Sequence, residues 1–211
     1  RIQAMKKAVT FWQKRNLSLY GRVYVSKTYL LSKIVFVSSI LRVPDEVKGE
    51  IKSVLYEYVW SGKKDRVKRS SVINDISDGG LNMVDVESFI LALKAAWMPR
   101  LIKYKGKWSA MFSMICSKLE VPEYYIWKTT CRYVDNCTIT KAFPDFYQDI
   151  IVAFNKTKHL KPLDKLSNYE LMTSTLWGNE LFKAKGQCLY FKNWLQAGFH
   201  FVKDLYDEEG N

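Results

Sequence analysis

The sequence predicts a mainly α-helical protein, in which a basic three-helix bundle is followed by a largely helical connector with short irregular or hairpin segments. Apolar residues recur at the spacing of one helix face over most of residues 1–60 and again over residues 86–104. Hydrophobic residues make up 48% of the chain and aromatic residues 15%, which is enough to bury one or two cores. We expect three regions: the bundle in residues 1–60, a basic loop, Gly-Gly turn and long helix in residues 61–110, and the connector in residues 111–211.

Two helices are predicted before Pro44. The first covers residues 1–15, and its apolar face consists of Ile2, Met5, Val9 and Trp12. Ser18 is suited to cap the second helix, which extends to about Leu41. The apolar face of this second helix consists of Val23, Leu30, Ile34, Val37 and Leu41. A different face, reached by steps of four, three and four residues, carries Arg22, Ser26, Tyr29 and Lys33.

A third helix is predicted from Asp45 to about Trp60. Pro44 ends the preceding element, because its ring cannot continue a helix. Asp45 and Glu46 suit the first turn of the new helix, where the dipole favours negative charge. Three helices joined by such short connections predict a compact bundle.

A polar segment, Ser61–Asp78, follows the bundle and contains a basic run at residues 62–69. Gly79 and Gly80 then indicate a tight turn. After this turn a fourth helix is predicted over about Val86–Tyr104, from its apolar spacing.

Shorter elements are predicted in the second half of the chain. Short helices are expected near residues 109–120 and 143–154, and a turn or short hairpin within residues 176–187. A last amphipathic stretch contains Trp194, Leu195, Phe199, Val202 and Leu205.

The distribution of charge points to a polyanionic partner. The chain has a net charge of +12, and residues 1–44 carry nine lysines and arginines with no aspartate or glutamate. Residues 1–110 hold 21 basic and 9 acidic side chains, whereas residues 111–211 hold 12 of each. Such asymmetry is typical of a nucleic-acid or membrane contact, and basic residues interleaved with aromatics favour nucleic acid.

Several classes of protein are not expected. No apolar run reaches the roughly 18 residues of a membrane span, so we expect no membrane contact. The N-terminus lacks the apolar stretch of a signal peptide, and the four cysteines include no CxxC pair. We therefore expect an intracellular protein, in a nuclear or cytoplasmic ribonucleoprotein and not secreted. Because the chain begins without methionine, we also expect it to be a piece of a longer protein.

A series of short motifs occurs in one order along nearly the whole chain. They are residues 12–23 (WQKRNLSLYGRV), Ser26-Lys27, 31–33 (LSK), Pro44, Trp60, 79–85 (GGLNMVD), 92–97 (ALKAAW) with Arg100, 176–179 (LWGN), 194–199 (WLQAGF) and 204–207 (DLYD). This order resembles the region downstream of the polymerase core in reverse transcriptases of non-LTR (LINE-type) retrotransposons.

The resemblance implies a thumb followed by a connector, or wrist-like, region. Such a thumb packs helices against the primer–template duplex, so the partners implied are RNA, an RNA–DNA hybrid and the remainder of the parent reverse transcriptase. The residues expected to contact nucleic acid are Arg15, Arg22, Ser26, Lys27 and Lys33 on the helices and Lys63, Lys64, Arg66, Lys68 and Arg69 in the basic loop. The residues expected to be structural are Trp12, Gly21, Trp60, Gly79, Gly80 and Trp97, with Gly21 also permitting close approach of the duplex.

Three of these assignments have open alternatives. The basic face of residues 15–33 can be an ordinary solvated helix surface that contacts no nucleic acid. The basic loop can equally be a flexible exposed segment that binds nothing specific. The tryptophans Trp12, Trp60, Trp97, Trp177 and Trp194 are interpreted as core residues, and the alternative is that they stack on bases.

No catalytic residue is predicted in this chain. Polymerases of the resembled family hold two metal ions with aspartates, two of them adjacent, and this chain has no Asp-Asp pair. We expect no metal site and no cofactor here, with Mg²⁺ used only in the palm of the parent polymerase. A zinc site built from Cys116, Cys131, Cys137, His159 and His200 is not expected, because the spacing fits no common finger. The alternative function is a stand-alone or domesticated helical module that binds an acidic protein partner or RNA.

Overall fold

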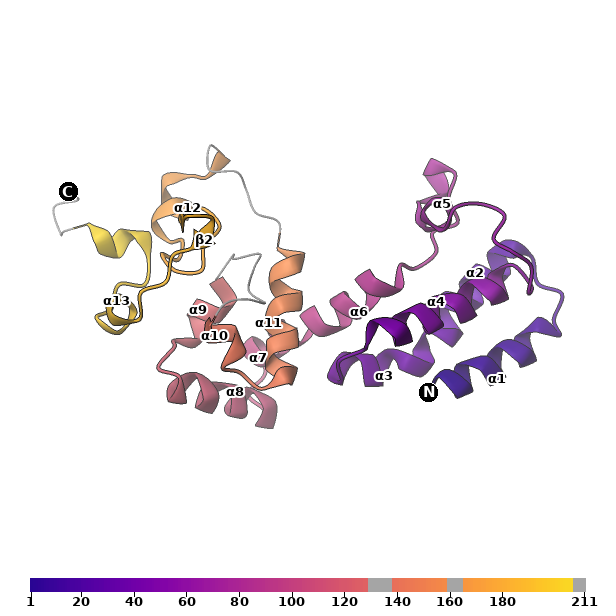
Figure 1. Cartoon of the computed structure of the whole chain (residues 1–211), viewed down its shortest axis with the longest axis horizontal. Coiled ribbons are helices and arrows are strands. Elements are labelled where there is room, and N and C mark those ends of the chain that lie inside the picture. Colours follow the sequence, from indigo (N-terminus) through magenta and orange to yellow (C-terminus); the bar gives the residue numbers. More distant parts are fainter. Residues whose placement is uncertain (129–137, 159–164, 207–211) are drawn as a thin grey trace. The chain divides into compact units, whose positions relative to one another are not determined.

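The computed structural model describes residues 1–128, 138–158 and 165–206 (Figure 1). Its contacts divide the chain into two compact units, Arg1–Leu93 and Lys94–Asn211. Nearly all regular structure in the described residues is helical, which confirms the prediction of a mainly α protein.

The first unit is built from the three predicted helical regions and the segment that follows them. Its elements are α1 (Ile2–Gln13), α2 (Leu19–Val25), the π-turn η1 (Ser26–Leu30), α3 (Ser32–Ile40), α4 (Asp45–Val59), the short α5 (Arg69–Ile73), the 3₁₀ turn η2 (Ile76–Asp78) and the start of α6 (Val86–Ala95).

The predicted start signals of two helices are present. Ser18 caps α2, because its Oγ accepts a hydrogen bond of 3.2 Å from the Gly21 N–H. Pro44 precedes α4, and Asp45 in the first turn of α4 pairs with Lys48 at 2.7 Å. Sequence and structure agree at both boundaries because each signal acts within a single turn.

The second predicted helix is interrupted by the π-turn. The Leu31 N–H donates to the Ser26 carbonyl oxygen at 3.1 Å, an i→i+5 hydrogen bond that includes one more residue than an α-turn. The helical segment that ends with this turn, Leu19–Leu30, and the next helical segment, Ser32–Ile40, are bent by 44° relative to each other. The extra residue changes which side chains share a face, so a strict 3.6-residue period cannot be followed across it.

The core of the first unit extends beyond the three-helix bundle. Met5, Leu30, Leu55 and Val59 have no exposed surface, and Trp60 is 9% exposed. The same hydrophobic cluster also includes the later residues Val72, Met83, Val86 and Ile90. Residues 1–60 therefore share one core with the segment that follows them.

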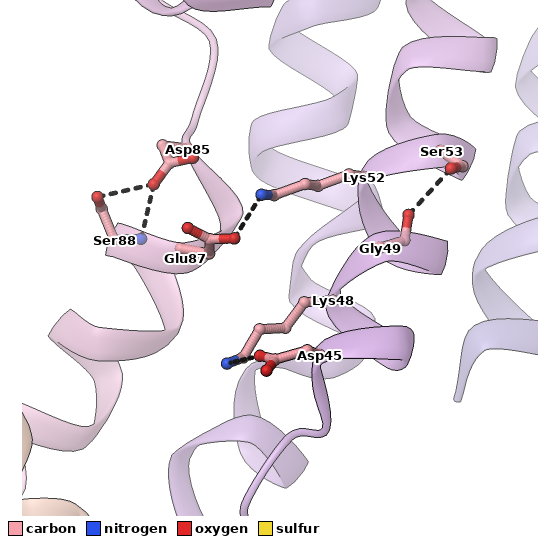
Figure 2. Close-up of polar contacts among 8 residues, drawn as sticks. All are labelled: Asp45, Lys48, Gly49, Lys52, Ser53, Asp85, Glu87 and Ser88. Atoms are coloured by element: carbon pink, nitrogen blue, oxygen red, sulfur yellow. Dashed lines mark hydrogen bonds and ion pairs between the residues drawn. The ribbon is translucent and has the colours of Figure 1, made fainter.

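Polar contacts join α4 to the beginning of α6 (Figure 2). Lys52 on α4 pairs with Glu87 on α6 at 2.6 Å. Asp85 caps α6, since its Oδ2 accepts hydrogen bonds of 2.8 Å from both the backbone N–H and the Oγ of Ser88. Burial alone would raise the pKa of Asp85, but the two Ser88 hydrogen bonds and the charge of Lys52 lower it below its ordinary value.

The predicted single helix over Val86–Tyr104 is wrong in one respect, because it is divided in two. α6 ends at Ala95, and a separate helix, α7 (Trp97–Lys103), begins after Ala96. Pro99 explains the break: it lacks the N–H that would bond the Ala95 carbonyl, and its ring is tolerated only in a first turn.

The second unit contains α7 and shorter elements. They are α8 (Lys107–Lys118), α9 (Glu123–Lys128), α10 (Thr138–Lys141), α11 (Asp145–Thr157), α12 (Asn168–Met172), β1 (Lys183–Ala184), β2 (Gln187–Cys188), α13 (Lys192–Gln196) and the 3₁₀ turn η5 (Val202–Leu205). α8 and α11 correspond to the two short helices predicted from the sequence. Their side chains Phe112, Tyr147 and Ile150 form the centre of the second hydrophobic cluster.

The predicted hairpin is also present. Lys183 pairs with Cys188 and Ala184 with Gln187 in an antiparallel register. The two residues between the strands, Lys185 and Gly186, have φ values of 51° and 78°. Positive φ at both central positions defines the type I′ turn, whose twist matches that of paired strands.

The tryptophans differ in burial. Trp177 is 3% exposed and belongs to the second cluster, as predicted. Trp194 is 50% exposed, so its assignment to the core is wrong. Its ring contacts Trp177 and Phe199 at 6.2 and 5.5 Å between centroids, which places it at the edge of the cluster.

Candidate nucleic-acid interface

The basic side chains Arg15 and Lys33 lie on aromatic rings at the surface of the first unit. The Arg15 guanidinium is 4.7 Å from the Phe11 ring centroid and 4.6 Å from that of Trp12. The Lys33 ammonium lies 4.0 Å from the Tyr29 ring, and the Trp12 and Tyr29 rings are 5.7 Å apart. The five residues Phe11, Trp12, Arg15, Tyr29 and Lys33 thus form a continuous surface, which we call the basic–aromatic face.

Three elements position this face: α1, the π-turn and α3. Phe11 is in the last turn of α1, and Arg15 lies four residues later, just beyond the end of this helix; Tyr29 in the π-turn and Lys33 in α3 are also four residues apart. Phe11 is 54% exposed and Tyr29 39%, so the rings that hold the two cations are themselves accessible. Such contacts contribute about 0.5–1 kcal/mol at exposed sites, and they also restrict where the charge can lie.

Arg22 and Lys27 differ from Arg15 and Lys33, because their side chains donate hydrogen bonds to backbone carbonyl oxygens. Arg22 Nη1 donates to the Val59 carbonyl oxygen at 3.2 Å, at the C-terminus of α4. Lys27 Nζ donates to the Asn82 carbonyl oxygen at 2.9 Å, just after the Gly-Gly turn. Both side chains connect segments of the first unit, and both retain further N–H donors for another acceptor.

Ser26 was expected to contact nucleic acid and has no exposed surface. It begins the π-turn and faces the core of the first unit, together with Val23 and Leu30. A side chain without exposed atoms cannot contact a phosphate, so the structure contradicts this assignment.

The basic loop is exposed in the structure. Lys63, Lys64, Arg66 and Lys68 are all exposed in the connection between α4 and α5. Arg69 differs from them, because it begins α5, pairs with Asp65 at 2.8 Å and lies 4.5 Å from the Tyr56 ring. Arg69 therefore has a structural role of its own, whereas the other four charges extend into solvent.

Gly79 and Gly80 of the predicted turn each require glycine, but for different structural reasons. A Cβ at Gly80 would lie 1.9 Å from the Asn74 carbonyl oxygen, which no side chain can tolerate. Gly79 has a φ of 75°, a left-handed conformation that ends η2. Gly21 is different, since a Cβ there would meet Leu17 and Ser18 atoms at an ordinary 3.5 Å.

Phe11 is the functional candidate that the sequence analysis missed. It falls outside the apolar face of α1 and is exposed, so the helical period gave it no role. The signal that could have found it is the aromatic–cation pair at i, i+4, which recurs as Tyr29 and Lys33.

Residues suited to metal or nucleophilic chemistry do not gather in the described ranges. In these ranges no group of three or more His, Cys, Asp or Glu side chains could hold a metal ion. Cys116 is buried, and burial, reinforced by the Glu123 carboxylate, raises the pKa of its thiol to about 12. Cys131, Cys137 and His159, three of the zinc candidates, lie outside the described residues.

Within the part of the chain that the structure describes, no single helix is long and apolar enough to cross a membrane, although Leu19–Leu30 and Ser32–Ile40 meet the length and composition requirements as a bent pair. No model of a known protein family matches the chain, and no solved structure matches it.

Proposed function

We propose that the first unit, Arg1–Leu93, holds an RNA–DNA duplex by its phosphate backbone, as the thumb of a LINE-type reverse transcriptase. The observation that carries the proposal is the basic–aromatic face, in which Arg15 and Lys33 are held on Phe11, Trp12 and Tyr29. This face lies within a stretch of 44 residues that contains no carboxylate to compete for the two cations.

Its chemistry suits contact with a backbone better than reading of bases. Arginine and lysine bind phosphates with little regard to sequence, and a polymerase must move along its product. The aromatic contacts of Arg15 and Lys33 limit the freedom of both side chains before binding, so less ordering is needed when a phosphate arrives. The exposed charges Lys63, Lys64, Arg66 and Lys68 add to the attraction of the same unit for a polyanion.

In this proposal the chain binds the duplex and does not catalyse the reaction. The two-metal reaction of the parent enzyme would use palm carboxylates supplied by another segment, and the connector in the second unit would join the thumb to the remainder of the enzyme. The duplex is then bound by one unit and acted on by another part of the polymerase.

A binding experiment with two RNA–DNA hybrids of unrelated sequence tests this proposal. The full chain is compared with the double variant Arg15→Ala/Lys33→Ala and with the control Lys165→Ala/Lys203→Ala. The control removes the same charge from exposed residues of the second unit, and Lys203 also lies near an aromatic ring, at 5.7 Å. The same circular dichroism spectrum for all three chains establishes that they are folded.

We expect the double variant to bind both hybrids at least about tenfold more weakly, because a charge-assisted hydrogen bond contributes about 1.5–3 kcal/mol. The control should bind as the unaltered chain does. Equal affinity of both double variants would overturn the proposal. Failure of the unaltered chain to bind either hybrid at low salt would instead favour the alternative, a basic module for an acidic protein surface.

A further inference from the structure

The boundary between the two units shows that both units carry a positive net charge. The first unit has 16 basic and 9 acidic residues, a net charge of +7, so the remaining +5 belongs to the second unit. Residues 94–110 contain five basic residues and no acidic one, which accounts for this whole surplus. The second unit thus has a concentrated basic segment of its own, which runs from the end of α6 through α7 and the connection after it to the start of α8 (Figure 1).

Four of these five cations face solvent. Lys94 is nearly buried and lies 3.4 Å from Asp149, so it is part of the interior of the second unit. Arg100, Lys103, Lys105 and Lys107 are exposed, and within the described ranges none of the four forms an ion pair. A group of cations without local carboxylates is suited to an external anion.

Aromatic side chains lie between these cations in the sequence and are exposed with them. Tyr104 is 62% exposed. Trp108 is 46% exposed, although its ring packs against Phe146 at 5.0 Å and Trp97 at 6.1 Å. Trp108 is therefore anchored on the unit and still presents almost half of its surface, as a stacking platform requires.

The backbone holds this region in a defined turn. In the connection between α7 and α8, the Gly106 N–H donates a hydrogen bond of 3.0 Å to the Tyr104 carbonyl oxygen. Ser109 Oγ on α8 donates to the Leu101 carbonyl oxygen on α7 at 2.7 Å. The cations and rings are thus carried by α7, the start of α8 and the short hydrogen-bonded connection between them.

We propose that Arg100, Lys103, Tyr104, Lys105, Lys107 and Trp108, the α7–α8 patch, bind a single-stranded nucleic acid. The cations would contact successive phosphates, and unpaired bases would stack on Tyr104 and Trp108. A single strand fits better than a duplex, because exposed rings can stack only on bases that are not already paired and stacked. Residues 94–110 present four exposed cations and contain no carboxylate. This charge is complementary to a polyanion, which favours nucleic acid over a protein surface as the partner.

This inference does not rest on the duplex contact proposed for the first unit. The two sites involve different units, different residues and different forms of nucleic acid, so either can fail alone. Their tests therefore use separate variants and separate probes.

The probe is a fluorescent 12-nucleotide oligouridylate, which has no base pairing of its own, measured against the full chain over a series of salt concentrations. Two variants alter the patch: Tyr104→Ala and Lys103→Gln/Lys105→Gln/Lys107→Gln. Each has a matched control in the same unit. Tyr169→Ala removes a tyrosine that is 77% exposed, and Lys165→Gln/Lys185→Gln/Lys203→Gln removes three other exposed charges.

We expect Tyr104→Ala to weaken oligouridylate binding about tenfold, as loss of one stacked base does, and Tyr169→Ala to have no effect. The triple patch variant should lower the slope of log affinity against log salt by about 2, since each phosphate contact on a single strand contributes about 0.7. An oligodeoxyuridylate arm, which differs only in lacking the 2′-hydroxyl, tells whether that hydroxyl contributes, and similar affinity for both strands is expected from stacking and charge.

The proposal is overturned if patch and control variants bind the oligouridylate equally, or if the unaltered chain does not bind it at low salt. It is also overturned if Arg15→Ala/Lys33→Ala abolishes oligouridylate binding while the patch variants do not, because the single strand then occupies the first unit. Undiminished hybrid binding by the patch variants would show that the two sites are separate.

Discussion

Arg22 donates from its Nη1 to the carbonyl oxygen of Val59 at 3.2 Å, joining α2 to the last residue of α4. The contact places a cation at the C-terminus of a helix of 15 residues, where the dipole favours positive charge. Arg22 therefore stabilises the first unit whether or not it also touches a phosphate, and substitutions of basic residues in this unit do not all test the same property.

Arg22→Ala is expected to lower the free energy of unfolding by about 1–2 kcal/mol, because the partly buried carbonyl of Val59 loses a charged partner. Arg15→Ala should lower it by less than about 1 kcal/mol, since the contacts of Arg15 are exposed cation–π contacts. Urea titration of both variants measures the difference. Equal losses would mean that the Arg22–Val59 hydrogen bond contributes little.

Local signals in the sequence predicted several of the helix boundaries correctly. Ser18 and the Pro44–Asp45 pair fixed two helix starts, because a cap or a proline acts on the backbone next to it. The π-turn at Ser26–Leu30 could not be predicted in this way, since it depends on how α2 and α3 pack on α1 and α4. The predicted face that contains Ser26 does not exist in the folded chain, because the Ser26 side chain is buried.

The candidate site was only partly predictable for a related reason. Counting charges identified the basic segment, and two of its residues, Arg15 and Lys33, do lie on aromatic rings at the surface of the first unit. The count could not tell that Arg22 and Lys27 bind carbonyl oxygens more than 30 residues away in the chain. It also placed the boundary of the positive charge at residue 110, whereas the units divide at Leu93 and Lys94.

Gly80→Ala is expected to unfold or strongly destabilise the first unit. The new Cβ would lie 1.9 Å from the Asn74 carbonyl oxygen, so the backbone of the turn must move, and we expect a loss of more than about 3 kcal/mol. Gly49→Ala in α4 is the matched control, because a Cβ there meets nothing within 4 Å and alanine favours the helix by about 0.5–1 kcal/mol. Thermal unfolding should therefore shift in opposite directions, and a tolerated Gly80→Ala would contradict the role of this turn as a tight backbone contact.

Gly21→Ala separates folding from binding. Its Cβ would make ordinary contacts of 3.5 Å with Leu17 and Ser18, just before α2, so the free energy of unfolding should stay the same or rise. If the duplex backbone approaches α2 closely at Gly21, the methyl group should weaken hybrid binding severalfold. Thermal unfolding and hybrid affinity are measured on the same preparation, and unchanged affinity would remove Gly21 from the proposed contact.

Asp85 predicts a pH dependence of stability (Figure 2). The pKa of Asp85 is lower in the folded chain than its unfolded value of about 3.9, so its contribution is fully present above that pH and is lost as the pH falls through the folded pKa. Asp85→Asn keeps a side chain that can cap α6 but cannot titrate. The stability advantage of the unaltered chain over Asp85→Asn should shrink below about pH 4, and a difference that is constant from pH 3 to 6 would contradict this role.

The salt dependence of duplex binding tests the central claim most directly, because it reports how many phosphates the basic–aromatic face neutralises. The slope of log affinity against log salt is measured for the full chain and for Arg15→Ala/Lys33→Ala with one RNA–DNA hybrid. Loss of two phosphate contacts should lower the magnitude of the slope by about 1.4–1.8. An unchanged slope in the double variant would mean that Arg15 and Lys33 do not touch the phosphate backbone, and that the thumb assignment of this face is wrong.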